Sequence, residues 1–166
     1  MKTAIYPGSF DPITNGHLDI LERVCKQFDK VYLLAAMNPN KKYTFTPEER
    51  VDFIKQAIGN NPKVEVETSS DLILNYAKEK NATVIIRGIR NIIDFQNEIT
   101  LFSFNRSISK DIDTFLLFPS SDNLFLSSSR IKELVLFNKP IDEYVPRHLA
   151  SEISRLIKLR LSKEKR

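Results

Sequence analysis

Short apolar runs alternate along this chain with longer segments in which apolar residues recur every three to four positions. The short runs are typical of β-strands, and the longer segments are typical of amphipathic helices. We predict strands at residues 3–6, 31–36, 64–66, 82–86 and 114–118. We predict helices from about residue 17, over 47–58, around 72–77, over 92–108, over 127–137 and after 146. This alternation indicates an α/β protein with a parallel sheet.

Two of the predicted helices have recognisable start signals. Thr46 as N-cap, Pro47 in the first turn and Glu49 as the closing residue form a capping box. Ser70 or Asp71 can cap the helix around 72–77. With the strand pattern, these signals predict one domain over residues 1–166. Its fold is an α/β, Rossmann-like doubly wound five-stranded parallel sheet with C-terminal helices.

Polar residues whose side chains could bind a ligand or take part in catalysis follow four of the five predicted strands. They are Ser9 and His17 after the first strand, Lys41 and Lys42 after the second, Arg87 and Arg90 after the fourth, and the serines at 127–129 after the fifth. The carboxyl ends of parallel strands meet at one edge of a sheet, where such folds bind ligands. We therefore expect these residues to surround one site.

The stretch GSFDPITNGH, residues 8–17, joins the first strand to the first helix. Gly8 has no side chain and can let a ligand approach the backbone closely. Gly16 lies at the start of the helix, where free amide groups and the helix dipole favour an anion. His17 follows in the first turn, so its ring can point at that anion. The alternative is a plain connecting loop whose histidine caps or packs.

Composition and charge narrow the function classes. The 42% hydrophobic fraction is ordinary for a globular protein, and no apolar run is long enough to cross a membrane. The net charge of +4 comes from residues 155–166, which carry six basic residues and one acid. We interpret this tail as a solvated helix end and expect no nucleic-acid partner. The single Cys25 and the lack of a signal-peptide pattern favour a cytoplasmic location.

The candidate groups are cations, hydroxyls, one histidine and helix N-termini. The chain has no nucleophile elbow, metal-ligand cluster, GxxxxGK[ST] loop or GxGxxG fingerprint. Such groups bind polyanions and stabilise charge that develops on phosphate, so we predict phosphoryl or nucleotidyl transfer. His17 would donate to a nonbridging oxygen of the phosphorus under attack. A phosphate nucleophile needs no general base, which explains why no strong base candidate is found.

GSFDPITNGH, the tetrad Arg87-Gly88-Ile89-Arg90 and the segment LSSSR at 126–130 resemble the bacterial phosphopantetheine adenylyltransferase family over nearly the whole chain. Thr14 favours this family over relatives that carry histidine there. The resemblance implies that ATP and 4′-phosphopantetheine give dephospho-coenzyme A and pyrophosphate, the penultimate step of coenzyme A synthesis. It also implies Mg²⁺ carried by ATP rather than by a protein metal site, a homohexamer, and coenzyme A as a possible feedback ligand.

The resemblance also assigns residue roles. His17 stabilises the transition state, with Ser9, Lys41 and Arg90 as further catalytic groups. Phosphopantetheine contacts Ser9, Lys41, Ile73 and Arg87, with Ile73 along the pantetheine arm. ATP contacts Ser9, Phe10, His17, Gly88, Ile89, Arg90, Glu98, Asn123, Leu124, Phe125, Leu126, Ser127, Ser128 and Ser129. The family usually has an aromatic residue where this chain has Asn123, which puts the adenine packing in question.

Several candidates also have ordinary structural interpretations. Lys41 can be half of a solvated pair with Lys42, and Arg90 can pair with Asp94 one turn later. The serines can be a simple N-cap run, and Glu98 can be a surface residue. We interpret His148 as structural and the aromatics Phe102, Phe104, Phe115 and Phe118 as core or interface. Two other functions stay open: a nucleotidyltransferase with another phosphorylated acceptor, and a non-catalytic nucleotide sensor or assembly subunit.

Overall fold

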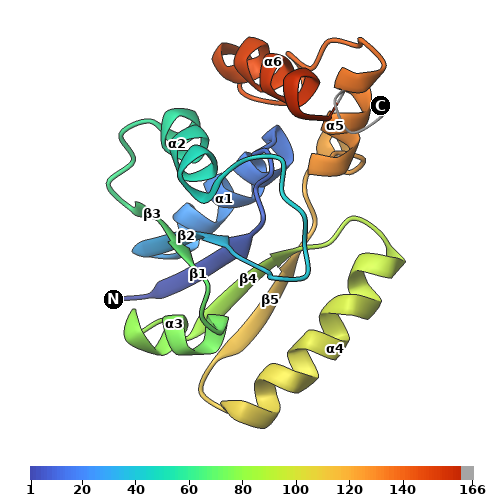
Figure 1. Cartoon of the computed structure of the whole chain (residues 1–166). Helices are drawn as coiled ribbons and strands as arrows, with labels where there is room; N and C mark the ends of the chain where they lie inside the picture. The colour runs from blue at the N-terminus through green and yellow to red at the C-terminus, as the bar shows by residue number, and fades with distance from the viewer. Residues whose placement is uncertain (162–166) are drawn as a thin grey trace.

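The predicted strands form one parallel sheet (Figure 1) in the computed structural model, which describes residues 1–161. They are β1 (Thr3–Gly8), β2 (Lys30–Ala36), β3 (Val64–Ser69), β4 (Val84–Gly88) and β5 (Asp113–Leu117). Their order across the sheet is β3-β2-β1-β4-β5, and all pairs are parallel. The strand order reverses between β1 and β4, which is where doubly wound sheets bind ligands. The predicted fold class is confirmed.

Helices cover both faces of the sheet (Figure 1). On one side of the sheet lie α1 (Asn15–Gln27), α2 (Pro47–Ile58), α5 (Ser128–Leu136) and α6 (Ala150–Leu161). On the other side lie α3 (Ile73–Glu79) and α4 (Ile92–Ile108). Two short 3-10 turns, Ser121–Asn123 and Arg147–Leu149, precede α5 and α6. Alternate residues of β1 divide between the two faces, as the strand period requires. Ala4 and Tyr6 join the larger core beneath α1 and α2, whereas Ile5 packs with α3.

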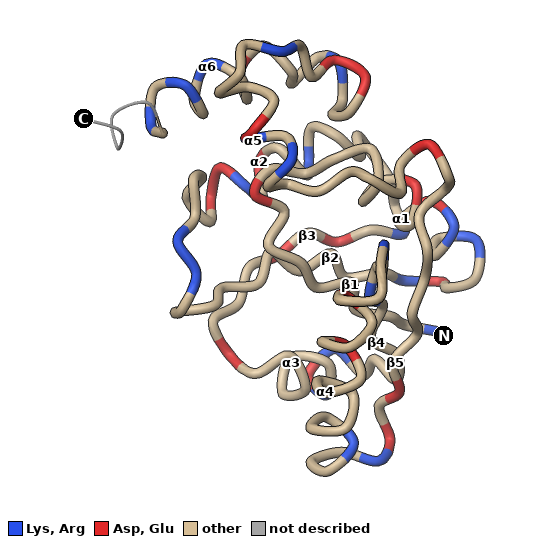
Figure 2. Tube along the Cα trace, turned by 90° about the vertical axis from the view of Figure 1, so that its right-hand side faces the viewer, with Lys and Arg blue, Asp and Glu red and all other residues tan. Residues whose placement is uncertain are grey.

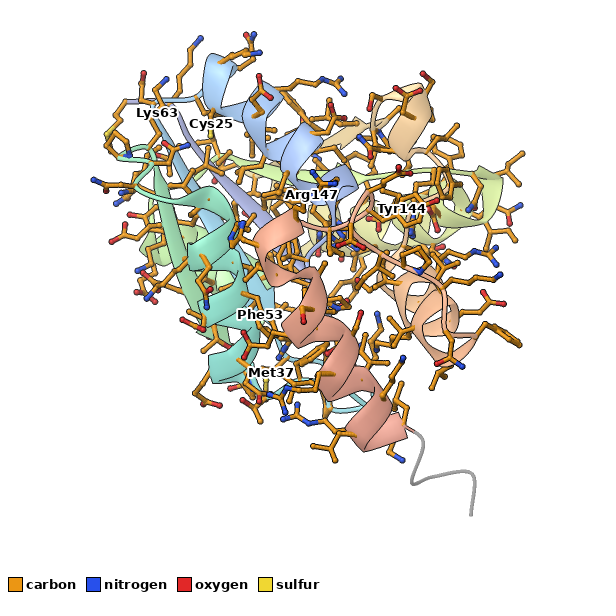
Figure 3. The ribbon with its side chains drawn as sticks, turned by 90° about the horizontal axis from the view of Figure 1, so that it is seen from above. Cys25, Met37, Phe53, Lys63, Tyr144 and Arg147 are labelled. Carbon is orange, nitrogen blue, oxygen red and sulfur yellow. The ribbon has the colours of Figure 1, made fainter. Side chains whose placement is uncertain are left out.

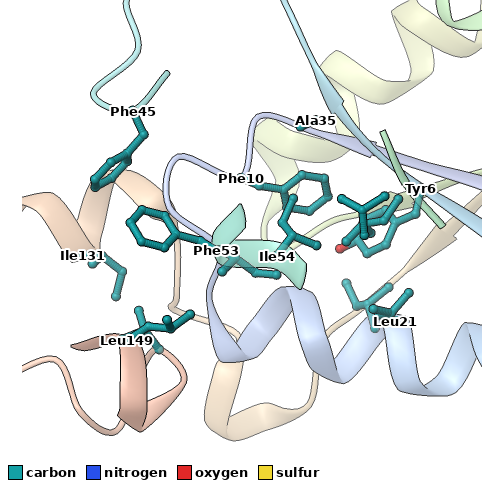
Figure 4. Close-up of a cluster of buried hydrophobic side chains, with 14 of the residues drawn as sticks. Tyr6, Phe10, Leu21, Ala35, Phe45, Phe53, Ile54, Ile131 and Leu149 are labelled. Atoms are coloured by element: carbon teal, nitrogen blue, oxygen red, sulfur yellow. The ribbon is translucent and has the colours of Figure 1, made fainter. Parts of the chain in front are cut away.

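The larger core extends from the sheet into the C-terminal helices. Phe45 and Phe53 pack edge to face with ring centroids 5.2 Å apart, and Ile131 of α5 and Leu149 lie close by in the same cluster (Figure 4). Each side chain of this size stabilises the fold by about 1.5–3 kcal/mol when buried. The core therefore holds α5 and α6 against α2 and against the segment that leads into it.

Most helix boundaries agree with the prediction, and the capping box of α2 is present, with the Thr46 hydroxyl 3.2 Å from the Glu49 amide. The predicted cap of α3 is wrong. That helix begins at Ile73 without a side-chain cap, because the Asp71 carboxylate accepts from the side-chain amide of Asn75 at 3.1 Å instead. The helix predicted after residue 146 begins at Ala150, behind a 3-10 turn.

Basic residues are spaced along α6 (Figure 2). Arg155 and Lys158 are exposed, as expected for a solvated helix end. Arg160 is not, because its guanidinium pairs with both carboxylate oxygens of Glu49 at 2.7 Å. The rest of the basic tail, residues 162–166, lies outside the described residues. Among residues 1–161, no helix has the length and apolar character required to cross a bilayer.

Cys25 lies near the C-terminal end of α1, beside Lys63 (Figure 3). The Lys63 ammonium donates to the Cys25 carbonyl at 2.8 Å. The thiol is half-buried against the core, and burial raises its pKa, so it is less reactive than an ordinary cysteine. Cys25 is therefore a small packing residue of α1.

Candidate active site

A cavity of about 610 Å³ opens at the carboxyl ends of β1, β2 and β4. Eleven of the predicted site residues line it: Ser9, Phe10, His17, Lys41, Ile73, Arg87, Gly88, Arg90, Glu98, Asn123 and Leu126. Ile89, Leu124, Phe125, Ser127, Ser128 and Ser129 are not part of the lining. The topology thus brings together residues that are far apart in sequence, as the positions of the strand ends predicted.

His17 is held by the first turn of α1. The Thr14 amide donates to His17 Nδ1 at 3.0 Å, and the Thr14 hydroxyl caps the helix at the His17 amide. Because Nδ1 accepts this bond, the proton of the neutral ring lies on Nε2. Burial, helped by the positive charge of Arg90, lowers the His17 pKa to about 4. At neutral pH the ring is therefore an uncharged Nε2–H donor at the cavity wall.

Phe10 supports His17 from behind. Its ring is 1% exposed and meets the His17 ring edge to face, with centroids 5.0 Å apart. The residue has a φ of 45°, an unusual conformation for a bulky side chain. A Cβ on Gly8 would lie 2.8 Å from this ring. Gly8 therefore makes room for the Phe10 ring. The sequence had suggested a different reason for this glycine, the close approach of a ligand to the backbone.

Arg87 forms an ion pair with Glu98. Its Nε and Nη2 donate to the two Glu98 carboxylate oxygens at 2.8 and 2.6 Å, and its Nη1 donates to the Pro7 carbonyl at 3.2 Å. Glu98 is 8% exposed, so its interpretation as a surface residue is wrong. Arg87 and Gly88 also lie within β4 rather than after it. The pair places one cation and one anion at the same wall of the cavity.

Arg90 connects two parts of the site. Its Nε donates to Asp94 at 3.0 Å, which is the ion pair that the sequence left as an alternative. Its Nη1 also donates to the Leu126 carbonyl at 3.0 Å. The second bond ties the segment before α5 to the start of α4. Arg90 thus has a structural role while it still lines the cavity.

The serines at 127–129 mark the start of α5. Ser127 is the N-cap and accepts from the Arg130 amide at 3.0 Å, so the N-cap interpretation is correct for this residue. The Ser128 hydroxyl donates to the Pro12 carbonyl at 2.7 Å. These two hydroxyl groups are thus engaged with protein partners.

The segment before the serines divides between the cavity and the surface. The side-chain amide of Asn123 donates to the Ser120 hydroxyl at 2.9 Å, and Asn123 itself lines the cavity. Phe125 is 56% exposed and packs edge to face with Tyr144 outside the cavity. Leu124 is exposed.

Two charged residues near the site were missed by the sequence analysis. Asp11 is buried, accepts from the amides of Thr44 and Phe45 at 2.8–3.1 Å, and forms an ion pair with Lys132 of α5. Arg50 of α2 is fully buried and donates to the Ser9 carbonyl at 2.7 Å. Asp11 lies inside the motif at 8–17, which could have signalled it. Arg50 lies in an ordinary charged helix start, which carries no such signal.

The chain matches a family model described as cytidylyltransferase-like over residues 5–134, which is most of its length. It therefore belongs to this family of nucleotidyltransferases. The fold agrees with a solved nicotinic acid mononucleotide adenylyltransferase of Plasmodium falciparum in complex with NaAD. That structure has a TM-score of 0.67 and 20% identity, over 96% of this chain and 98% of the solved chain.

Curated relatives identify the family of nucleotidyltransferases more closely. The phosphopantetheine adenylyltransferase of Nautilia profundicola is 41% identical over 150 residues, which cover 90% of this chain and 97% of the relative. The enzyme of the same name from Geotalea daltonii is 45% identical over 146 residues, covering 88% and 91%. The one from Synechococcus elongatus is 43% identical, covering 90% of each chain. This chain belongs to the phosphopantetheine adenylyltransferase family.

Proposed function

We propose that this chain is an enzyme that transfers the adenylyl group of ATP to 4′-phosphopantetheine, giving dephospho-coenzyme A and pyrophosphate. One observation carries the proposal. A neutral His17 with its proton on Nε2 lines the same cavity as Ser9, Lys41, Arg87 and Arg90. This combination supplies a donor for charge that develops on phosphorus, with cations for two anionic substrates.

The proposed reaction is a direct displacement. An oxygen of the phosphopantetheine phosphate forms a bond to the α-phosphorus of ATP, and the bond from that phosphorus to the bridging oxygen breaks. Pyrophosphate leaves with the electron pair. His17 Nε2–H donates to a nonbridging oxygen of the α-phosphate, where negative charge grows in the transition state. The phosphate nucleophile is already anionic, so no side chain needs to remove a proton from it.

The two substrates would share Ser9 and otherwise contact different lining residues. Lys41 and Arg87 would hold the nucleophilic phosphate, and Ile73, which lines the cavity at the start of α3, would contact the pantetheine arm. The ion pair with Glu98 supports Arg87 in this role, because it fixes the guanidinium through two bonds and leaves Arg87 at the cavity wall.

ATP would lie beside phosphopantetheine and would also contact Ser9. It would contact the walls formed by Gly88, Arg90, Glu98, Asn123 and Leu126. Phosphate contacts at the start of α5 would use backbone amides, because the Ser127 and Ser128 hydroxyls have other partners. In this arrangement the backbone near residue 89 and the segment 124–129 would complete the nucleotide site.

Magnesium is proposed to arrive with the nucleotide. Within residues 1–161, no group of three or more His, Cys, Asp and Glu side chains could hold a metal ion. Two carboxylates that line the cavity, Asp94 and Glu98, are paired with Arg90 and Arg87. This donor set does not suit a resident ion, so the triphosphate would supply the ligands for Mg²⁺. Bound to the nucleotide, such an ion would offset part of the negative charge of the phosphates.

Self-association to a homohexamer, feedback by coenzyme A and a cytoplasmic location belong to the same proposal. The face of α4 supports the first, because it exposes large apolar side chains, including Ile92, Ile93 and Phe104. Exposed apolar patches of this kind mark interaction surfaces. Phe102, Phe115 and Phe118 are also exposed, so the alternative that these aromatics form the core is wrong and an interface is the fitting interpretation.

An acceptor comparison tests the proposed activity. Pyrophosphate release is measured with ATP and, in separate reactions, with phosphopantetheine, nicotinamide mononucleotide and glycerol phosphate. We expect turnover with phosphopantetheine alone. Turnover with another acceptor would indicate a related nucleotidyltransferase instead, and ATP binding without any turnover would indicate a non-catalytic nucleotide sensor.

A further inference from the structure

Arg50 joins the two loops that carry Ser9 and Lys41. The residue lies in the first turns of α2, is 0% exposed, and is not itself part of the cavity lining. Its Nη1 donates to the Ser9 carbonyl at 2.7 Å and to the Ala36 carbonyl, at the end of β2, at 3.2 Å. Its Nη2 contacts the Met37 sulfur at 3.1 Å. One rigid guanidinium therefore sets the separation between the loop after β1 and the loop after β2.

A second set of contacts leads from Arg50 to Lys41. The guanidinium stacks on the Tyr43 ring, 4.2 Å from its centroid. The Tyr43 hydroxyl accepts from the Asn38 amide at 2.8 Å, and the Asn38 carbonyl accepts from the Lys41 amide at 3.0 Å. This turn presents Lys41 at the cavity wall. The position of Lys41 thus depends on Tyr43, and the position of Tyr43 depends on Arg50.

The charge environment of Arg50 differs from that of the other arginines at the site. Arg87 and Arg90 are paired with Glu98 and Asp94. Within residues 1–161, the groups that contact Arg50 are two carbonyls, a thioether and a phenol ring, all of which are neutral. A buried charge without a counterion is costly, and its Nε atom is buried with no hydrogen-bond partner. An apolar residue would pack there at lower cost, which indicates a functional reason for an arginine.

We propose that Arg50 is a positioning residue that aligns the two substrates by holding Ser9 and Lys41 at a set separation. This inference rests on the proposed function, because the alignment matters only if both residues bind phosphate groups. A displacement of about 1 Å between reacting groups costs on the order of a hundredfold in rate. Loss of the guanidinium should therefore reduce activity even if the fold survives.

The test is a double-mutant cycle in the pyrophosphate-release assay, with Arg50→Lys, Lys41→Ala and their combination. Lysine keeps the positive charge but lacks the planar fork that bridges the two loops. We expect Arg50→Lys alone to reduce kcat/KM for phosphopantetheine about a hundredfold, through a higher KM and a lower kcat. In the Lys41→Ala background the same change should cost only about tenfold, because the contribution that Arg50 makes through Lys41 is already absent and only its bond to the Ser9 carbonyl is left to lose.

Ile54→Ala is the matched control for stability. Ile54 lies one turn after Arg50 on the same helix and is also 0% exposed, but its apolar side chain offers no hydrogen bond to either loop. This variant should lower the melting temperature at least as much as Arg50→Lys and leave KM for phosphopantetheine within about twofold. A loss of kcat/KM in Ile54→Ala equal to that of Arg50→Lys would overturn the proposal, because a general loss of stability would then explain both variants.

Tyr43→Phe provides a second test that does not depend on a buried charge. It keeps the ring beneath the guanidinium but removes the hydroxyl that holds the Asn38 amide. We expect a roughly fivefold to tenfold higher KM for phosphopantetheine, again suppressed by Lys41→Ala. Equal effects of Arg50→Lys in the two backgrounds would overturn the role of Arg50. A wild-type chain without turnover would instead refute the proposed function, and the inference with it.

Discussion

Helices α1 and α4 use apolar side chains in opposite ways. In α1 the buried positions are Gly16, Ile20, Leu21 and Val24, and the last three belong to the larger core against the sheet. In α4 the buried positions are polar, Glu98 and Asn105. Leu101 is half-buried at the cavity, and the other large apolar residues of α4 are exposed: Ile92, Ile93, Phe95, Ile99, Phe102, Phe104 and Ile108.

This contrast separates two kinds of support for the same cavity. The apolar stripe of α1 fixes the helix on the sheet, so its first turn can hold His17 in one orientation. Helix α4 contributes carboxylates instead, through Asp94 and Glu98, and keeps its apolar face outward. A helix that exposes its apolar residues has the composition of an interface, whereas α1 has that of a core helix.

The largest expected effect comes from the first turn of α1. His17→Ala should reduce kcat about a thousandfold, because the Nε2–H bond matters most in the transition state, while the Kd for ATP stays within about threefold. Steady-state kinetics and calorimetric titration with ATP measure the two quantities. His148→Ala is the control, since His148 contacts the Gln56 carbonyl away from the cavity. Equal losses in ATP binding and turnover would contradict this role of His17.

Truncation on the two helices tests the contrast directly. Leu21→Ala removes a buried side chain and should lower the free energy of unfolding by about 3 kcal/mol. Ile99→Ala removes a side chain that is 47% exposed and should cost less than about 0.5 kcal/mol at low protein concentration. Urea unfolding measures both changes, and sedimentation tests whether Ile99→Ala weakens self-association. Similar losses of stability would show that α4 does not differ from α1.

Arg87→Ala tests the charged side of α4. It leaves the Glu98 carboxylate buried without its cation, which should destabilise the fold by about 2 kcal/mol. It should also raise KM for phosphopantetheine about tenfold, by loss of a charged hydrogen bond. Adding Glu98→Gln should recover stability but not KM, as urea unfolding and kinetics can show. Recovery of both would mean that Arg87 acts only as the partner of Glu98.

The smallest expected effect is a pH dependence of stability. The His17 pKa is about 4 in the folded chain and 6.5 ordinarily, so the unfolded chain binds more protons between these values. Stability should therefore fall as pH drops from 6.5 to 4. Because the ring is half-buried and solvent screens part of the effect, we expect a loss of about 1–2 kcal/mol. His17→Gln should remove this contribution in urea titrations at pH 7 and 4.5; an unchanged pH dependence would contradict the assignment.

Much of the fold could be predicted from sequence because its signals are local. The run at 31–36, the capping box of Thr46 and Glu49, and the bounds of α4 all follow from spacing within a few residues. The sequence also predicted that His17, Lys41 and Arg87 lie around one cavity, because the carboxyl ends of parallel strands lie at the same edge of the sheet. The cap of α3 was predicted wrongly, because Ser70 and Asp71 both fit the N-cap pattern but the helix begins without a side-chain cap.

The site contains details that no local pattern carries. Glu98 was interpreted as a surface residue because its helix is only weakly amphipathic. Gly8 was interpreted as a ligand contact, but in the structure the Phe10 ring lies where a Cβ of residue 8 would be. Arg50 looked like one charge among several at a helix start. Each depends on a neighbour at least two residues away that only the folded chain brings into contact.

The sequence by itself determined the order of strands and helices, the strand ends that carry polar groups, and the family. Those depend on periodicity and motif, which are properties of neighbouring residues. The tertiary structure decided the approach of Arg90 to His17, the pairing of Arg87 with Glu98, and the burial of Arg50 against the Ser9 carbonyl. Those depend on the packing of α1, α2 and α4 against the sheet, because burial and charge pairing are set by groups distant in the chain.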